Sequence, residues 1–257
     1  MKYLKTNYAD IEEIKIDDIP TLLITPRGDN VDKTIVFYHG WGSSKLNQVF
    51  RANIFASYGY RVLLPDAQLH GERKTKEIDY EDEDVMRKYI LEVIMHNIEE
   101  APSIFKYVEE NFGGEIAVAG HSMGAITAGG LYNFKKDLKM AFIYNGMNDW
   151  AFLVEAVNKS KDVENTSYTE LRVNDFFLDM DPMNEPENFK DRPIVLFNGK
   201  EDNVVNPKAQ RNFAEEIEKV YTKKELLDFQ VFEMTSHQLT TQMLEASIKF
   251  SKEIAGF

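Results

Sequence analysis

The sequence contains no cysteine, which excludes disulfide bonds, thiolate metal sites and a cysteine nucleophile. It also lacks any apolar run close to the length of about 18 residues that a membrane-spanning helix needs. The amino-terminal residues read MKYLKTNYADIEEIK, a stretch that soon turns acidic and has no apolar core of the kind found in signal peptides. We therefore expect a cytoplasmic protein, either a monomer or a small oligomer such as a homodimer.

Positive charge is scarce as well, with 30 lysine and arginine residues against 43 aspartate and glutamate residues and a formal net charge of −13. This balance repels the phosphate backbone of nucleic acids and anionic membrane surfaces, so we expect neither as a partner. In other respects the composition, 43% hydrophobic and 28% charged, is that of an ordinary globular protein. A chain of 257 residues is long enough for one sizeable domain, and we expect residues 1–257 to form a single one.

The hydrophobic pattern predicts an α/β fold. Residues 11–16 and 21–25, with Asp17 and Asp18 as the turn between them, predict an amino-terminal antiparallel hairpin. Later strands are continuously apolar and alternate with helices, which indicates a mostly parallel central sheet with helices on both faces. Pro102 predicts a break or kink in the helix expected at about residues 85–113. The later strands are expected at residues 34–38, 61–64, 115–119, 140–144, 193–197 and 227–232, and the helices at about 46–58, 85–113, 123–134, 207–221 and 239–254.

Residues 120–124 read Gly-His-Ser-Met-Gly, and their surroundings make this short motif informative. An apolar strand precedes the motif and a helix follows it. A Gly-x-Ser-x-Gly turn between a strand and a helix is typical of a nucleophile elbow, where the glycines make room for closely approaching backbone. The motif therefore predicts Ser122 as a catalytic nucleophile. The alternative is a glycine-rich helix start in which Ser122 is only a capping residue.

A nucleophilic serine needs a base, and the base needs a carboxylate that orients it. His237 is the histidine that lies beyond the last predicted strand, just before the last helix, and it is the predicted base. Asp202 follows strand 193–197 and a short turn, and it is the predicted carboxylate. The order Ser122, Asp202, His237 is the order that this architecture requires. Glu201 is adjacent to Asp202 but should point the opposite way if the turn is extended.

Two backbone amides should stabilise the oxyanion of the reaction. Met123 supplies one at a helix N-terminus, and Trp41 in the loop His39-Gly40-Trp41 is the expected second donor, although this loop could also be a simple turn. His39 could line the substrate pocket or be structural. Residues 66–73 form a polar loop at the carboxyl end of another strand, the edge where ligands bind in open α/β sheets. In this loop His70 could line the pocket or anchor the loop by a hydrogen bond.

These motifs together resemble the α/β-hydrolase superfamily over nearly the whole chain. The loop at residues 39–41, residues 66–73, residues 120–124, residues 199–202 and His237 fall in the order that the family shows. Within it, the chain is similar to single-domain prolyl-oligopeptidase-like and dienelactone-hydrolase-like esterases, and it lacks the large propeller domain of prolyl oligopeptidases. The resemblance implies hydrolysis of a small-molecule carboxylic ester through an acyl-enzyme, without a cofactor or a metal.

Other functions remain open on the same fold. Thioesters and small peptides or aminoacyl compounds are alternative substrates within the enzyme class. A non-catalytic binding module is the alternative from a different class, because fold alone does not prove function. Such a module would be expected to have lost a nucleophile, acid or base, whereas all three are present here in order.

Residues 147–192 interrupt the alternation of strands and helices. They are polar, partly helical and free of predicted strands, so we expect a small cap insertion over the sheet edge and call it the cap segment. Its apolar side chains must pack on something. Either they only cover the sheet edge, or Trp150, Phe176 and Phe177 roof the substrate pocket and restrict it to short acyl groups.

Overall fold

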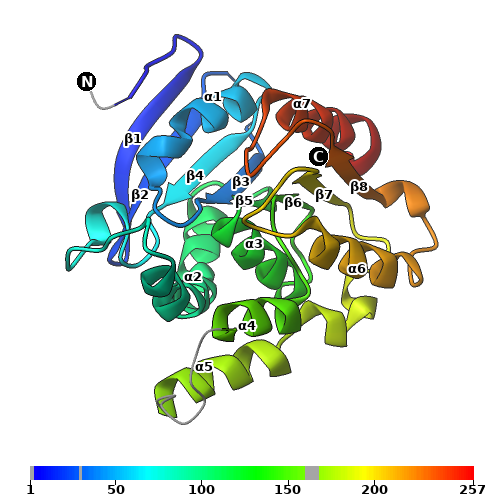
Figure 1. The fold of residues 1–257 in the computed structure, drawn as a ribbon. Helices are drawn as coiled ribbons and strands as arrows, with labels where there is room; N and C mark the ends of the chain where they lie inside the picture. Colours follow the sequence, from blue (N-terminus) through cyan, green and yellow to red (C-terminus); the bar gives the residue numbers. More distant parts are fainter. Residues whose placement is uncertain (1–2, 29–30, 160–167) are drawn as a thin grey trace.

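The computed structural model describes residues 3–28, 31–159 and 168–257, which form one sheet covered by helices (Figure 1). The strands are β1 (Ala9–Ile16), β2 (Ile19–Pro26), β3 (Lys33–Tyr38), β4 (Arg61–Pro65), β5 (Glu115–His121), β6 (Ala141–Tyr144), β7 (Ile194–Gly199) and β8 (Leu227–Phe232). Their order in the sheet is β1-β2-β4-β3-β5-β6-β7-β8. β2 is antiparallel to both β1 and β4, whereas every later pair is parallel. The predicted α/β fold, with an amino-terminal hairpin on a mostly parallel sheet, is confirmed.

The predicted helices are also present, and the longest one does not break. The helices are α1 (Val49–Ser57), α2 (Glu83–Asn111), α3 (Met123–Phe134), α4 (Trp150–Asn158), α5 (Tyr168–Asp179), α6 (Pro207–Glu218) and α7 (Thr241–Phe250). α2 begins at Asp82, whose carboxylate accepts hydrogen bonds from the first amides of the helix. It then continues through Pro102, because the neighbouring side chains of Ala101, Ile104 and Phe105 are buried in the core and hold the helix on the sheet.

Alternate residues of the central strands point to opposite faces of the sheet and build two separate cores. On β3, Ile35 and Phe37 belong to the core beneath α1 and α7, whereas Val36 and Tyr38 belong to the core beneath α2, α3 and α6. All four side chains are buried. Because helices cover both faces (Figure 1), the loops at the carboxyl ends of the parallel strands are left at one edge, where ligands bind in sheets of this kind.

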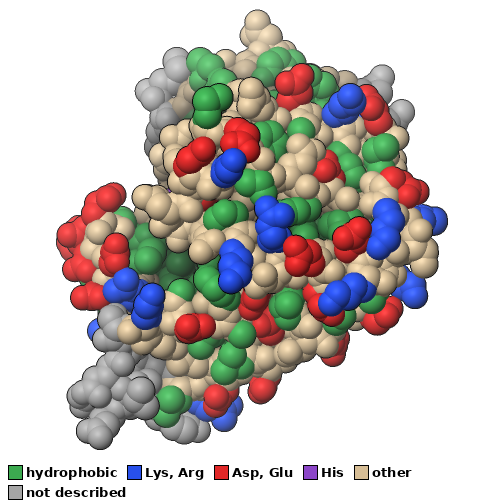
Figure 2. Space-filling view, turned by 45° about the vertical axis from the view of Figure 1, so that its right-hand side comes forward, with side chains coloured by type: hydrophobic (Ala, Val, Ile, Leu, Met, Phe, Trp, Pro, Cys, Tyr) green, Lys and Arg blue, Asp and Glu red, His purple; other side chains and the backbone are tan. Residues whose placement is uncertain are grey.

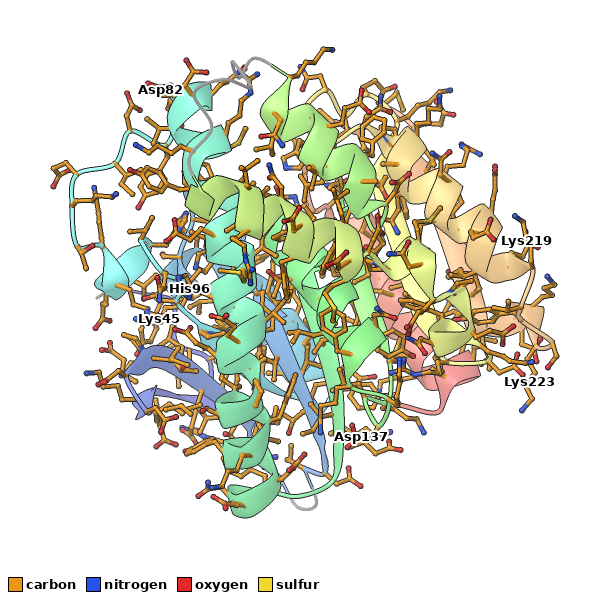
Figure 3. All side chains as sticks on the ribbon, turned by 90° about the horizontal axis from the view of Figure 1, so that it is seen from below. Lys45, Asp82, His96, Asp137, Lys219 and Lys223 are labelled. Atoms are coloured by element: carbon orange, nitrogen blue, oxygen red, sulfur yellow. The ribbon has the colours of Figure 1, made fainter. Side chains whose placement is uncertain are left out.

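The cap segment packs on the helices of one face. α4 and α5 contact each other and α2, and Figure 3 shows α5 lying across α2. The ring of Trp150 lies 6.1 Å from that of Phe134 on α3 and 4.8 Å from that of Phe177 on α5. The same apolar cluster reaches Met123, the first residue of α3. Packing therefore connects the cap segment to the helix that follows the Gly-x-Ser-x-Gly motif.

The surface carries mixed charge. Figure 2 shows acidic and basic side chains interspersed with apolar ones over one face of the molecule. In the part of the chain that the structure describes, no helix is both long enough and apolar enough to cross a membrane.

Substitutions of Trp150 test the packing of the cap segment. Trp150→Ala should lower the free energy of unfolding by about 3–5 kcal/mol, because it leaves a cavity between α3 and α5. Trp150→Phe should cost less than about half of that, since the indole Nε1 has no hydrogen-bond partner among the described residues. Urea denaturation followed by circular dichroism measures both losses. Equal losses for the two variants would contradict a role based on ring packing.

Candidate active site

Ser122 lies at the sharp turn between β5 and α3. Its backbone has φ 57° and ψ −124°, a conformation that a non-glycine residue adopts only when its surroundings enforce it. Its amide donates to the carbonyl of Tyr144 on β6 over 3.0 Å. A Cβ on Gly124 would lie 2.1 Å from the Tyr38 carbonyl oxygen, and one on Gly120 would lie 2.0 Å from the Gly124 carbonyl oxygen. Within the described residues the Ser122 hydroxyl makes no capping hydrogen bond to α3, so nothing supports the alternative role as a helix cap.

Asp202 and His237 meet at the carboxyl ends of β7 and β8. The Nδ1 of His237 donates to Oδ2 of Asp202 over 2.7 Å. The other carboxylate oxygen, Oδ1, accepts hydrogen bonds from the amides of Val204 and Val205, both at 2.9 Å. The buried carboxylate is therefore fixed in one orientation. A carboxylate on Nδ1 leaves Nε2 of His237 as the ring nitrogen that can accept a proton.

Two other acidic residues that could compete for the histidine are engaged elsewhere. Glu201 is exposed, and its carboxylate accepts a hydrogen bond from the Met234 amide at 3.1 Å. Asp181 is buried in the cap segment, where its carboxylate accepts from the Ala151 amide at 2.7 Å and burial raises its pKa. The described residues contain no group of three or more histidine, aspartate or glutamate side chains suited to a metal ion.

The loop after β3 passes directly over Ser122. A Cβ on Gly40 would lie 3.2 Å from the Cβ of Ser122, so the loop backbone is in van der Waals contact with the serine. The amide of Gly42 is already engaged, because it donates a hydrogen bond to Nε2 of His70 in the loop after β4. Trp41 lies between these two glycines. On the other side of the serine, Met123 is the first residue of α3, where an amide has no acceptor within the helix.

His39 and His70 anchor loops, which favours the structural alternative for both residues over the expectation that they line the substrate pocket. His39 is 2% exposed; its Nδ1 donates to a carbonyl of its own loop and its Nε2 accepts from the Ala67 amide at 3.1 Å. His70 is fully buried, with Nδ1 donating to the Gln68 carbonyl over 2.7 Å and Nε2 accepting from the Gly42 amide at 3.1 Å. All four ring nitrogens are occupied, so these imidazoles join the loop after β3 to the loop after β4.

A buried ion pair holds the same two loops together. The Nζ of Lys45 donates to Asp66 at 2.7 Å and to Glu72 at 2.6 Å, and the Lys45 amide donates to Asp66 at 2.8 Å. Figure 3 shows Lys45 beside the amino-terminal hairpin. Lys45 and Asp66 are 2% and 1% exposed. A buried pair with its hydrogen bonds satisfied adds little net stability, but it fixes one arrangement of the loops that carry it.

The cap residues take different positions from those expected. Trp150 and Phe177 are fully buried, and a Cβ on Gly130 of α3 would lie 2.6 Å from the Trp150 ring. Neither side chain can contact a substrate in an open pocket, because both lie fully buried inside an apolar cluster that α2, α3, α4 and α5 build together. This corrects the expectation that they roof the pocket. Phe176 is partly exposed and packs against Phe177, with ring centroids 5.6 Å apart.

Sequence reasoning did not single out Asn145 or the surroundings of His121. The His121 ring lies 5.0 Å from that of His237. Burial, together with the neighbouring His237 and Arg51, lowers the pKa of His121 to about 3, so this imidazole is neutral at physiological pH. Asn145 follows β6 directly and donates to Nε2 of His121 at 3.3 Å. An asparagine after a buried strand is a signal that could have been used, because this residue tolerates positive φ and bonds readily to nearby backbone.

The chain matches two related protein families. Residues 35–144 match the alpha/beta hydrolase family, and residues 101–257 match the prolyl oligopeptidase family. Together with the sheet order and the turn at Ser122, the first match defines a member of the α/β-hydrolase superfamily. The second match covers more than half of the chain, and within the superfamily the chain belongs to the prolyl oligopeptidase family.

Two relatives align with nearly the whole of this chain. The chain is 26% identical over 257 residues to Esterase YjfP of Escherichia coli strain K12, an alignment that covers 95% of this chain and 98% of the relative. It is also 26% identical over 243 residues to Putative esterase YitV of Bacillus subtilis strain 168, with 89% and 92% covered. The crystal structure of TT1662 from Thermus thermophilus has the same fold, with a TM-score of 0.80, 20% identity and coverage of 97% and 99%.

The buried histidines make stability sensitive to acid. Burial lowers the pKa of His70 to about 4, below the value of about 6.5 for a histidine in the unfolded chain. The unfolded state therefore binds more protons as pH falls below about 6.5, and stability present above that pH is lost toward pH 4. His70→Gln should reduce the slope of unfolding free energy against pH by up to about 1.4 kcal/mol per pH unit in this window. Urea denaturation at pH 8 isolates the packing loss of the variant, and a wild-type slope between pH 6 and 4.5 would contradict the prediction.

Proposed function

We propose that this protein is a serine esterase that hydrolyses carboxylic esters of small molecules through an acyl-enzyme on Ser122. The observation that carries the proposal is the 2.7 Å hydrogen bond between His237 and Asp202, at the sheet edge where the strained Ser122 lies. A carboxylate, an imidazole and a serine on an elbow are the three parts that acyl transfer by a serine hydrolase needs.

In the first half of the proposed reaction, the Oγ of Ser122 attacks the carbonyl carbon of the ester. Nε2 of His237 takes the serine proton, and Asp202 stabilises the resulting imidazolium and holds its tautomer. The tetrahedral intermediate then collapses: the bond to the alcohol oxygen breaks, and His237 returns the proton to that oxygen. The alcohol leaves, and the acyl group stays on Ser122.

In the second half, water takes the place of the alcohol. His237 removes a proton from the water, whose oxygen attacks the acyl carbon, and the proton then returns to the Oγ of Ser122 as the carboxylic acid departs. In both halves the amides of Trp41 and Met123 are the proposed oxyanion donors. The loop anchors described above support this assignment, because donors contribute most when their positions are fixed before the reaction.

Two further observations bear on the substrate. Relatives named as an esterase and a putative esterase align over nearly the whole of this chain, which favours esters. The match to the prolyl oligopeptidase family makes aminoacyl and peptide bonds the second candidate. A panel of p-nitrophenyl esters, thioesters and aminoacyl p-nitroanilides separates the two. Turnover of the anilides with no turnover of the esters would favour the second candidate.

The nucleophile is tested by labelling and substitution. A fluorophosphonate should modify Ser122 alone, and Ser122→Ala should lower kcat for p-nitrophenyl acetate by at least about 10³-fold in a protein that remains folded. Intact and peptide mass spectrometry locate the label. Ser57→Ala, which removes an exposed hydroxyl on α1, is the control and should keep wild-type activity. A label on another serine, or an active Ser122→Ala, rules out the proposed mechanism.

The role of Asp202 is tested by substituting it and its neighbour Glu201, whose carboxylates make different contacts. Asp202→Asn should lower kcat by roughly 10³- to 10⁴-fold, because an amide favours the wrong tautomer of His237. Glu201→Gln is the matched control and should leave kcat close to wild type, since Glu201 is exposed and bonded to the Met234 amide. Steady-state kinetics on p-nitrophenyl acetate measure both. A greater loss in Glu201→Gln would show that Asp202 is the wrong assignment.

A further inference from the structure

Asn145 occupies an unusual position next to the site. It is the first residue after β6, its side chain is fully buried, and its backbone lies in the left-handed region with φ 47°. Its amide donates to the carbonyl of Phe197 on β7 over 2.8 Å, so the backbone is held between two parallel strands. The side chain therefore starts from a fixed point at the carboxyl edge of the sheet.

Each hydrogen-bonding group of the Asn145 side chain is used, and each one reaches a different segment of the proposed site. Nδ2 donates to the carbonyl of Gln238 at 2.8 Å and to Nε2 of His121 at 3.3 Å. Oδ1 accepts from the amide of Gly199 at 2.8 Å. An asparagine amide has two N–H donors and one oxygen, and here all of them have partners.

The three partners are close in sequence to the three proposed catalytic residues. Gln238 follows His237, His121 precedes Ser122, and Gly199 lies at the end of β7 in the turn that leads to Asp202. We propose that Asn145 is a positioning residue, whose side-chain amide fixes the His237 loop relative to the Ser122 turn and the Asp202 turn. This inference rests on the proposed function, since it assigns a role in the reaction of that same site.

The Asp202–His237 hydrogen bond alone does not set the position of the imidazole relative to Ser122, because a ring bonded at Nδ1 can still move with its loop. The bond from Asn145 to the Gln238 carbonyl connects the backbone of that loop to the sheet. Misplacement of a catalytic group by about 1 Å can cost about 10²-fold in rate. A single buried amide can therefore affect kcat without touching the substrate.

A merely structural role predicts something different. Asparagine is one of the few residues that tolerate positive φ, so Asn145 could be needed only for its backbone. Asn145→Gly keeps the backbone conformation and removes all three side-chain bonds. Asn145→Asp keeps the acceptor for the Gly199 amide but places an oxygen opposite the Gln238 carbonyl. The two variants separate stability from positioning.

Asp191 offers a matched control at the opposite edge of the sheet. It also has a positive φ, 53°, and its carboxylate accepts from the amides of Thr222 and Lys223 at 2.8 and 2.9 Å, far along the chain. It precedes the amino end of β7, away from the proposed site. Asp191→Gly should therefore change stability without changing catalysis.

The experiment measures kcat and KM for p-nitrophenyl acetate, the rate at which a fluorophosphonate labels Ser122, and the melting temperature. We expect Asn145→Gly to lower kcat and the labelling rate by about 10- to 100-fold with KM nearly unchanged, and Asp191→Gly to leave all three kinetic values near wild type. Asn145→Asp should recover part of the melting temperature but not kcat. If Asn145→Gly does not fold, the kinetic values and melting temperature of Asn145→Asp are compared with those of the wild type and Asp191→Gly instead.

Results that would overturn the positioning role of Asn145 differ from results that would overturn the proposed function. An active wild-type enzyme with wild-type kcat in Asn145→Gly, or a loss confined to KM, would overturn the positioning role. Recovery of kcat together with melting temperature in Asn145→Asp would do the same. A wild-type protein that neither hydrolyses the ester nor takes the label at Ser122 would instead remove the proposed function itself.

Discussion

Ser122 has a positive φ because the chain turns from β5 into α3 within one residue. Backbone atoms of the neighbouring strands β3 and β6 lie close to this turn and leave no room for another path. The Tyr38 carbonyl lies where a side chain on Gly124 would be, and the Tyr144 carbonyl accepts the Ser122 amide at 3.0 Å. Strain of this kind costs of order 1–3 kcal/mol and persists only where the surroundings enforce it. The parallel sheet provides that enforcement. The loop after β3, α3 and the turn after β7 are all arranged around this residue.

Buried polar groups hold the loops near Ser122 in place. His39 and His70 use every ring nitrogen on backbone atoms, and Lys45 and Asp66 form a buried pair beneath them. Such contacts contribute modest net stability but specify a single geometry. The same burial lowers the pKa of both histidines, so the rigidity of the site and the predicted acid sensitivity of the fold have one physical cause.

The cap segment stands apart from this polar framework. Trp150 and Phe177 are buried in an apolar cluster with residues of α2 and α3, and this cluster reaches Met123 beside the serine. The cap segment therefore supports the helix that begins at the proposed oxyanion site, and Trp150 and Phe177 act through packing. The geometry of the proposed catalytic residues depends on the sheet edge, and the apolar cluster stabilises the elements attached to that edge.

The sequence by itself determined the order of strands and helices, because apolar periodicity and glycine placement are local properties. It also identified the motif around Ser122 and the pairing of Asp202 with His237, since a strand end, a turn and a fixed order along the chain restrict the choices. It could not determine that His39, His70 and Trp150 are buried, because burial depends on which segments approach from elsewhere in the chain. The partners of Asn145 could not be determined from the sequence for the same reason: they are separated from it by 24, 54 and 93 positions, and only the parallel sheet brings them within hydrogen-bonding distance.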